Sequence, residues 1–157
     1  MKLTEIPLGL SGRVFRSPMP FSHYDPEETL YDSFKKESIA AIVVLVQEGE
    51  MKSVSGRDLK KMYIDDGYKV LFIPTMDYSI PSRELLMDTV DEAVKLASDG
   101  KNVVVHCHAG IGRAGVFLAT MAKSVLGMSG EEAIRFIREY VPYALQSESQ
   151  CRFVKSE

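Results

Sequence analysis

The chain has 157 residues, with 45% hydrophobic and 26% charged side chains, a composition typical of one globular domain and not of a disordered or fibrous chain. Its formal net charge of −3 provides no general attraction for nucleic acid or for an anionic membrane surface, since both require clustered lysine and arginine. We therefore expect a single domain over residues 1–157, a monomer that binds neither nucleic acid nor membranes, with any anion site confined to a local cluster of residues.

The apolar segments are too short for a membrane span, and the cysteines are too few for a disulfide framework. The longest apolar run is Ile39 to Val46, whereas a membrane-spanning helix needs about 20 residues. Cys107 and Cys151 are the two cysteines, and such a low number fits a reducing compartment. We expect a cytoplasmic protein.

Strands and helices are predicted to alternate along the chain. Short runs rich in β-branched residues predict buried strands over 39–46, 70–73 and 103–105. Helical period and helix-terminating residues predict helices over 25–37, 56–65, 82–100, 113–126, 131–140 and from 147 onward. The last two follow Ser129 and Ser147, each of which begins a capping box.

This alternation predicts an α/β fold with a central, mostly parallel, twisted sheet flanked by helices on both faces. Ligands of such sheets bind at the carboxyl ends of the strands. The loops that follow Val46, Ile73 and Cys107 are therefore expected to share the active edge, with Asp65 and Asp66 at the opposite edge.

The segment around Cys107 combines a strand, a glycine-rich turn and a helix, which is the geometry that aims backbone N–H groups at an anion. Cys107 stands where the strand ends and Arg113 where the helix begins. The guanidinium of Arg113 can hold two phosphate oxygens, and the same positive field favours a thiolate. Gly110 and Gly112 allow the backbone to turn its amides inward, and His106 can hydrogen-bond the loop from behind.

The sequence His106-Cys107-x-x-Gly110-x-Gly112-Arg113 resembles the phosphate loop of the protein tyrosine and dual-specificity phosphatases. Two further segments resemble the general-acid loop and the glutamine loop of small dual-specificity enzymes, namely Ile73 to Asp77 with Pro81, and Ala144 to Ser147 with Gln150. The resemblance to the compact phosphatases of archaea and bacteria covers nearly the whole chain.

The resemblance implies a protein tyrosine phosphatase-like fold and a phosphocysteine intermediate on Cys107, with no metal and no cofactor. Asp77 would protonate the leaving oxygen and then act as base, and Gln146 would place the attacking water. Residues 108–113 would bind the phosphate of a phosphorylated protein substrate or another oxyanion: His108, Ala109, Gly110, Ile111, Gly112 and Arg113.

Topology alone also favours Asp77 as the acid, because it follows the strand that ends near Pro74 and so lies at the active edge. Glu48, to which we assign a supporting role, and Glu50 are the alternatives, since their loop follows the strand that ends at Val46. Ala114 stands where most of the resembled family carries Ser or Thr. We expect this missing hydroxyl to slow the breakdown of the phosphoenzyme.

Three other functions compete with this interpretation. Gly110 to Gly115 also matches the G-x-G-x-x-G dinucleotide fingerprint, yet Glu131 and Glu132, where an acidic residue would end the next strand, are predicted to open a helix. The chain could instead be a module that binds phosphorylated partners without hydrolysing them. A zinc site at His106, Cys107 and His108 is disfavoured because alternate residues of an extended segment point to opposite faces. For the substrate we expect phosphotyrosine, with or without phosphoserine and phosphothreonine.

Overall fold

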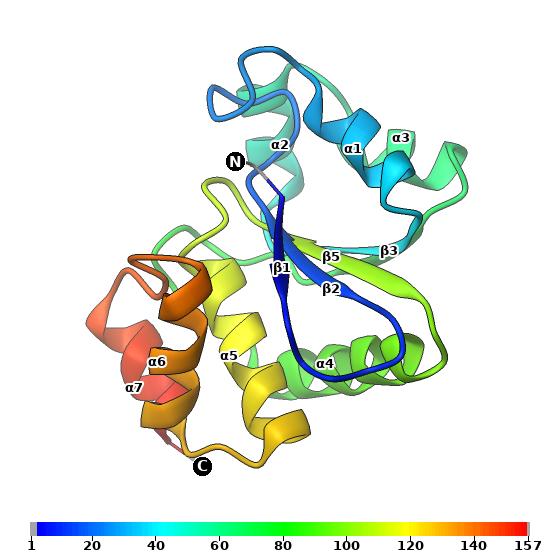
Figure 1. The fold of residues 1–157 in the computed structure, drawn as a ribbon. Coiled ribbons are helices and arrows are strands. Elements are labelled where there is room, and N and C mark those ends of the chain that lie inside the picture. Colours follow the sequence, from blue (N-terminus) through cyan, green and yellow to red (C-terminus); the bar gives the residue numbers. More distant parts are fainter. Residues whose placement is uncertain (1–2, 157) are drawn as a thin grey trace.

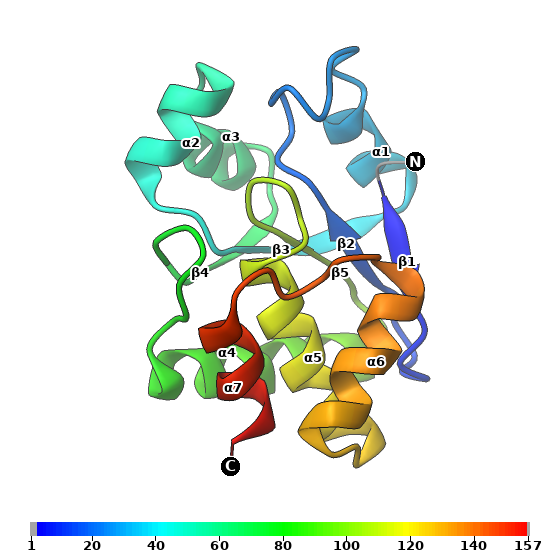
Figure 2. The ribbon, with the colours of Figure 1, turned by 90° about the vertical axis from the view of Figure 1, so that its left-hand side faces the viewer.

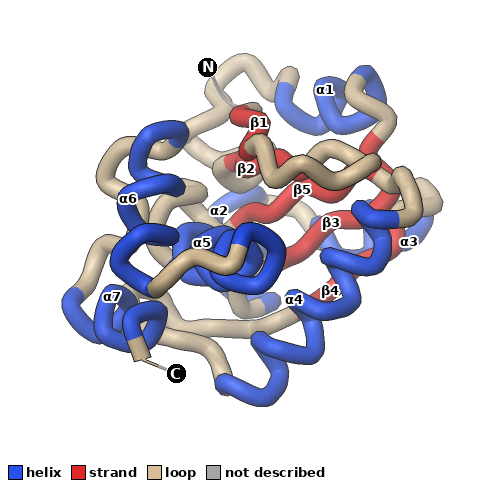
Figure 3. The backbone as a smooth tube through the Cα atoms, turned by 60° about the horizontal axis from the view of Figure 1, so that its bottom comes forward, coloured by secondary structure: helices blue, strands red, loops and turns tan. Residues whose placement is uncertain are grey.

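The computed structural model describes residues 3–156, and these form a five-stranded sheet between two layers of helices (Figure 1). The strand order is β1-β2-β5-β3-β4, as Figure 3 shows, with β1 antiparallel to β2 and the other neighbouring pairs parallel. The strands are β1 (Thr4–Ile6), β2 (Val14–Ser17), β3 (Ile39–Val44), β4 (Lys69–Phe72) and β5 (Asn102–His106).

The helices divide between the two faces of the sheet, with α1 to α3 on one side and α4 to α7 on the other (Figures 1 and 2). They are α1 (Leu30–Lys36), α2 (Glu48–Ser55), α3 (Leu59–Asp65), α4 (Arg83–Ser98), α5 (Arg113–Leu126), α6 (Gly130–Tyr140) and α7 (Glu148–Lys155). The predicted fold class is therefore confirmed. Within residues 3–156, none of these helices is long and apolar enough to cross a membrane.

The core lies around β5, the middle strand, which is covered from below by α5. Val103, Val104 and Val105 are completely buried, and β5 pairs with β2 on one side and with β3 on the other. Ten consecutive residues of α5, from Arg113 to Ala122, are also buried. Burial of a valine or leucine side chain stabilises the fold by about 1.5–3 kcal/mol, so the strand and helix on either side of the Cys107 loop are firmly anchored.

The prediction of a helix from residue 25 was wrong, because α1 begins only at Leu30. The chain from 25 to 28 is a turn in which Glu28 has a left-handed backbone (φ 56°) that a helix cannot include. The buried Asp25 still has a capping function, since its carboxylate accepts hydrogen bonds from the N–H groups of Phe21, Thr29 and Leu30.

The sequence also failed to predict α2, and the helix expected over 56–65 is shorter than expected. Gly56 terminates α2 in a left-handed conformation (φ 73°), and α3 begins after Asp58, whose side chain accepts a hydrogen bond from the Lys61 N–H group. Only Met51 of α2 is buried, so this helix has almost no apolar periodicity to reveal it.

The predicted strand over 39–46 ends at Val44, although Leu45 and Val46 remain buried. The short strands β1 and β2 were not predicted either. By contrast, the predicted helices over 113–126 and 131–140 are confirmed to within one residue, as are both capping boxes.

Strands β3 and β5 are neighbours, yet the helices that follow them, α2 and α5, lie on opposite faces of the sheet (Figure 2). Such a switch in connection opens a crevice at the carboxyl ends of the two strands. The residues that follow β3, β4 and β5 meet there, as the topology predicts.

Candidate active site

The loop between β5 and α5 has its backbone carbonyls turned outward. The Met19 N–H group donates to the carbonyl of His108 (2.8 Å), and the Leu145 N–H group donates to that of Ile111 (2.9 Å). The side chain of Arg16 donates to the carbonyls of Ala109 (2.8 Å) and Gly110 (2.9 Å). Among the described residues, nothing accepts a hydrogen bond from the backbone N–H groups of residues 108–112. Four outward carbonyls with unpaired amides between them form a cradle for an anion.

Two glycines of this loop lie close to neighbouring groups, and the backbone contact makes glycine necessary at Gly110. Gly110 has a left-handed backbone (φ 83°), and a Cβ atom there would lie 2.5 Å from the Ser17 carbonyl oxygen. At Gly112, a Cβ atom would lie 2.5 Å from Oε1 of Gln146. Gly110 thus lets the loop lie against β2, and Gly112 leaves room for the glutamine that enters the site.

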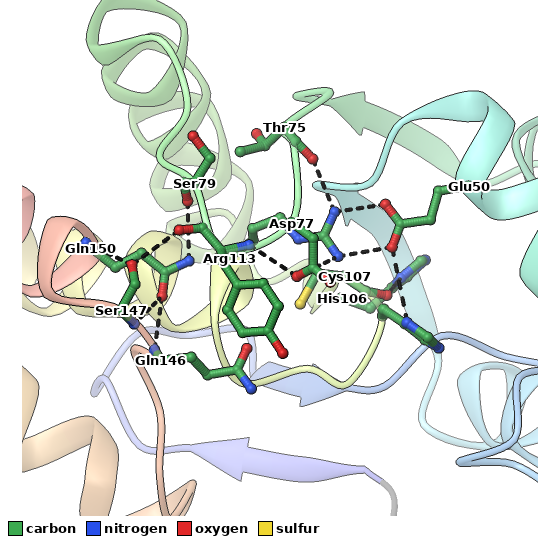
Figure 4. A network of polar contacts seen from close by, with 12 residues as sticks. Glu50, Thr75, Asp77, Ser79, His106, Cys107, Arg113, Gln146, Ser147 and Gln150 are labelled. Atoms are coloured by element: carbon green, nitrogen blue, oxygen red, sulfur yellow. Dashed lines mark hydrogen bonds and ion pairs between the residues drawn. The ribbon is translucent and has the colours of Figure 1, made fainter.

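Arg113 begins α5 and is one of the largest completely buried side chains of the protein. Its two terminal nitrogens bind the two carboxylate oxygens of Glu50 at 2.8 and 2.9 Å, and Nη1 also donates to the Thr75 carbonyl (Figure 4). Burial works to lower the pKa of Arg113, but the hydrogen bonds to Glu50 and the charges of Cys107, Glu50 and Asp77 together raise it. The guanidinium therefore stays positively charged.

The Nε–H group of Arg113 is buried and has no partner among the described residues. An unpaired buried donor of this kind is costly, and an oxyanion at the loop would satisfy it. The side chain is therefore fixed by Glu50 and Thr75 while one donor remains available beside Cys107.

The structure pairs Arg113 with Glu50 and not with Glu48, the residue expected to have the supporting role. Both residues lie in the first turn of α2, where a separation of two positions places them on different sides of the helix. Glu48 is exposed and lines a separate depression on α2, whereas the Glu50 side chain is only 20% exposed. The supporting carboxylate is therefore Glu50, and the unrecognised helix α2 explains why the sequence did not distinguish the two.

Asp77 lies in the loop after β4, where its Oδ1 atom is 3.3 Å from Nη2 of Arg113. The neighbouring residues of this loop are fixed by the start of α7: the Ser147 hydroxyl donates to the Tyr78 carbonyl, and Nε2 of Gln150 donates to the Ser79 carbonyl (Figure 4). Oε1 of the completely buried Gln150 accepts from the Gln146 and Ser147 N–H groups. A single glutamine thus connects the Asp77 loop to the Gln146 loop.

These side chains line one pocket of about 220 Å³. Its walls are Tyr24, Asp77, Tyr78, Cys107, His108, Ala109, Arg113 and Gln146. Cys107, Arg113, Asp77 and Gln146, which the sequence predicted to act together, are therefore brought together from three separate loops. The negative charge of a Cys107 thiolate would also be attracted to two guanidiniums, Arg16 and Arg113.

His106 lies completely buried behind Cys107. One ring nitrogen, Nδ1, is 2.9 Å from the Cys107 carbonyl, and the other, Nε2, is 2.9 Å from the Tyr63 hydroxyl. A carbonyl can only accept, so Nδ1 carries the proton and Nε2 accepts from Tyr63. Burial lowers the pKa of His106 to about 4, with Arg113 acting in the same direction and the bond to Cys107 against it. His106 is therefore a neutral ring that orients the loop.

This burial predicts a loss of stability in mild acid. The unfolded chain binds a proton at His106 near its ordinary pKa of 6.5, whereas the folded chain does so only near 4, so stability falls as pH decreases between these values. We expect the free energy of unfolding to fall by about 2 kcal/mol more in the wild type than in His106→Asn between about pH 7 and pH 5. Urea unfolding at both pH values measures this, and parallel losses in the two proteins would contradict it.

His108 lies at the mouth of the pocket, with Nδ1 3.9 Å from Oε2 of Glu50. The rings of His23 and Tyr24 contact it edge to face, at centroid distances of 5.2 and 5.3 Å. Burial lowers the pKa of His108, opposed by Glu50, so its side chain is mainly uncharged near neutral pH. The remaining residues that were predicted to belong to the site are Ala109, Ile111 and Ala114. Ala114 is completely buried, and its side chain has no hydroxyl to offer the thiolate.

Two residues that hold the loop, Arg16 and Tyr63, were not predicted from the sequence. Arg16 is the one charged residue of strand β2, and burial lowers its pKa while Cys107 raises it. A lone arginine between buried strand residues could have identified it. Tyr63 carries no such indication, since a buried tyrosine on α3 has the same pattern as any core aromatic.

Two of the competing functions find no support in the geometry. In the part of the chain that the structure describes, α5 is followed by helices and by no strand. Glu131 and Glu132 lie in the first turn of α6, so neither can be the acidic residue that ends the next strand of a dinucleotide-binding fold. Across residues 3–156, no group of three or more histidine, cysteine, aspartate or glutamate side chains is placed to hold a metal ion.

The chain matches the model of a known protein family. The model of a family described as a polymorphic toxin system DSP-PTPase phosphatase matches residues 21–125, about two thirds of the chain. A curated relative, the protein tyrosine phosphatase domain-containing protein 1 of Bos taurus, is 28% identical over 134 residues, which is 80% of this chain but 17% of that protein. The chain thus spans less than a fifth of the length of this curated relative.

Several solved structures are also similar to this chain. The crystal structure of Tk-PTP in the active form superposes with a TM-score of 0.80 and 28% identity, covering 97% of this chain and 94% of that one. The crystal structure of PTPMT1 in complex with PI(5)P has a TM-score of 0.76 and 23% identity, covering 90% and 87% of the two chains. The second likeness concerns the fold alone.

Proposed function

Since this chain belongs to the polymorphic toxin system DSP-PTPase phosphatase family, we propose that it hydrolyses phosphotyrosine in proteins through a phosphocysteine intermediate on Cys107. The observation that supports this most directly is the convergence of Cys107, Arg113, Asp77 and Gln146 on one small pocket. We propose phosphorylated proteins as its partners, and inorganic phosphate or another oxyanion would occupy the same loop.

In the first step, the Cys107 thiolate attacks phosphorus, so that a sulfur–phosphorus bond forms while the bond to the leaving oxygen breaks. Asp77 gives its proton to that oxygen, which is needed because a free tyrosine has a pKa of about 10 and its anion leaves reluctantly. The loop amides and the Nε–H group of Arg113 hold the three remaining oxygens.

In the second step, a water held by Gln146 attacks phosphorus and the sulfur–phosphorus bond breaks. The Asp77 carboxylate takes a proton from this water, and Cys107 returns to a thiolate as phosphate is released. Ala114 provides no hydroxyl to the departing thiolate, so we propose that this second step is slow enough for the phosphoenzyme to accumulate.

Asp77 is a better candidate for the acid than Glu50 because the two oxygens of Glu50 are both bound to Arg113, while the Asp77 side chain is 49% exposed beside the pocket. We expect Asp77→Asn to lower kcat/KM for phenyl phosphate and phosphotyrosine by about 10²-fold or more, but to affect p-nitrophenyl phosphate far less, since its leaving group needs little protonation. Steady-state kinetics with the three substrates measure this.

Asp88→Asn is the matched control, because Asp88 is exposed on α4 and lies outside the pocket. This variant should keep the wild-type values of kcat/KM for the three substrates in the same order. If Asp77→Asn reduced the rate equally for good and poor leaving groups, the acid would have to be Glu50 or Glu48.

The pocket also favours a monoester on a protein over a multiply charged lipid headgroup. Arg113 is the one lysine or arginine side chain among the described residues that line it, and the loop between Cys107 and Arg113 has no lysine. The PI(5)P of the PTPMT1 complex belongs to that protein. Phosphotyrosyl, phosphothreonyl and phosphoinositide substrates compared side by side should show hydrolysis of the phosphotyrosyl substrate, and preference for the phosphoinositide would contradict the proposal.

A further inference from the structure

The side chain of Arg16 extends from β2 to the outer side of the Cys107 loop. Arg16 pairs with Val105 of β5, so its backbone is fixed beside the strand that ends just before Cys107. Its Nε–H group donates to the Gly110 carbonyl at 2.9 Å, and its Nη2 group donates to the Ala109 carbonyl at 2.8 Å. The rigid fork of a guanidinium can reach both carbonyls at once, which a lysine ammonium cannot match.

These two hydrogen bonds determine where the next two amides point. In a planar trans peptide unit, the C=O and N–H groups point in opposite directions. Because Arg16 holds the carbonyls of Ala109 and Gly110 outward, the N–H groups of Gly110 and Ile111 point toward the inside of the loop. Arg16 therefore directs two of the donors that an anion in this loop would use.

Arg16 also brings a positive charge close to Cys107. Burial lowers the pKa of Arg16, whereas the charge of Cys107 raises it, so the guanidinium and a thiolate attract one another. The other charged or titratable side chains around Cys107 are His106 behind it and Tyr24, Asp77, Tyr78, His108 and Arg113 in the pocket. Of these, Arg113 is the other cation, and its charge is shared with the carboxylate of Glu50.

When the sulfur–phosphorus bond of the intermediate breaks, its electron pair returns to sulfur, and Ala114 has no hydroxyl to stabilise that charge. We infer that Arg16 is a positioning residue for this second step: it directs the loop amides toward the sulfur and attracts the departing thiolate. It thereby takes over part of the function of the hydroxyl that Ala114 lacks. This inference rests on the proposed function, because it requires the phosphocysteine intermediate.

Rapid mixing with excess p-nitrophenyl phosphate separates the two steps, because the first turnover releases p-nitrophenol and later turnovers wait for hydrolysis of the phosphoenzyme. We expect Arg16→Gln to lower the steady-state rate by about five- to tenfold and to keep the burst, since a more basic thiolate leaves more slowly. The pH at which iodoacetate alkylates Cys107 at half its maximal rate should rise by about one unit. Arg16→Lys keeps the charge, so its alkylation should stay close to the wild type.

Ala114→Ser separates this role from a general loosening of the fold. A serine hydroxyl at this position can donate to the sulfur, so in the Ala114→Ser protein Arg16→Gln should lower the steady-state rate by about twofold or less. A purely structural loss would lower the rate by the same factor with alanine or serine at position 114. Arg13→Gln is the matched control, because Arg13 is exposed just before β2 and pairs with Glu37, and it should keep the wild-type rate and alkylation.

Wild-type kinetics and alkylation in Arg16→Gln, or an equal loss of rate with alanine and with serine at position 114, would overturn the inference and leave the proposed function intact. If Arg16→Gln does not fold, Arg16→Lys decides: a loss of rate that Ala114→Ser does not reduce would overturn the inference. Turnover by the wild type without any phosphoenzyme would overturn the proposed function and the inference with it.

Discussion

Replacement of Cys107 by serine is expected to abolish hydrolysis, with kcat/KM for p-nitrophenyl phosphate falling by at least about 10⁴-fold. A serine hydroxyl holds its proton far more firmly than a thiol does, and His106 cannot remove it, because Nε2 already accepts from Tyr63 and Nδ1 donates to the Cys107 carbonyl. Phosphate should still bind, since Arg113 and the loop amides are unchanged. Steady-state kinetics and phosphate titration measure the two effects separately.

Cys151→Ser is the matched control for this experiment. Cys151 is the other cysteine, partly buried on α7 and absent from the pocket lining, and its variant should retain most of the activity. Activity that persisted in Cys107→Ser would exclude the covalent mechanism. Equal loss in both variants would point to a general sensitivity of the fold to cysteine replacement.

The second large effect is expected for Arg113→Lys, with a loss of about 10²- to 10³-fold in kcat/KM. Lysine keeps the positive charge opposite Glu50 but cannot hold Glu50 with two parallel bonds and a phosphate oxygen with a third donor. Inhibition by inorganic phosphate should weaken in parallel, because the same donor is lost from the free enzyme. Kinetics with phosphate as a competitive inhibitor measure both.

Arg152→Lys provides the corresponding control, since Arg152 forms an exposed ion pair with Glu148 on α7. Its activity and phosphate inhibition should match the wild type. If Arg113→Lys kept the wild-type affinity for phosphate, the proposed role of the guanidinium in anion binding would be wrong.

The parts of the fold with strong apolar patterns could be predicted from the sequence. β5 and α5 bury long continuous runs, and the capping boxes at Ser129 and Ser147 begin α6 and α7 as expected. Helices with weak patterns were not predicted correctly. α2 was missed because it buries one residue. The start of α1 was misplaced because a buried aspartate that caps a helix from a distance gives the same sequence pattern as a helix start.

The same division holds at the candidate site. Cys107, Arg113, Asp77 and Gln146 could be placed because their loops follow strands or resemble known motifs, and the structure brings them to one pocket. Arg16, Glu50 and Tyr63 act on the loop across 43 to 94 residues of chain, through contacts that only the folded structure specifies. Their roles depend on the direction in which each side chain points, as the contrast between the exposed Glu48 and the Arg113-bound Glu50 shows.

The most direct test of the mechanism is to identify the phosphorylated residue during turnover. The wild type and Gln146→Ala, in which the water is poorly placed, would be mixed with excess p-nitrophenyl phosphate, quenched in acid within the first turnovers, and digested for mass spectrometry. One phosphoryl group on the peptide that contains Cys107, with greater occupancy in Gln146→Ala, is the predicted result. A phosphoryl group on another residue, or turnover with no phosphorylated peptide in either protein, would contradict it.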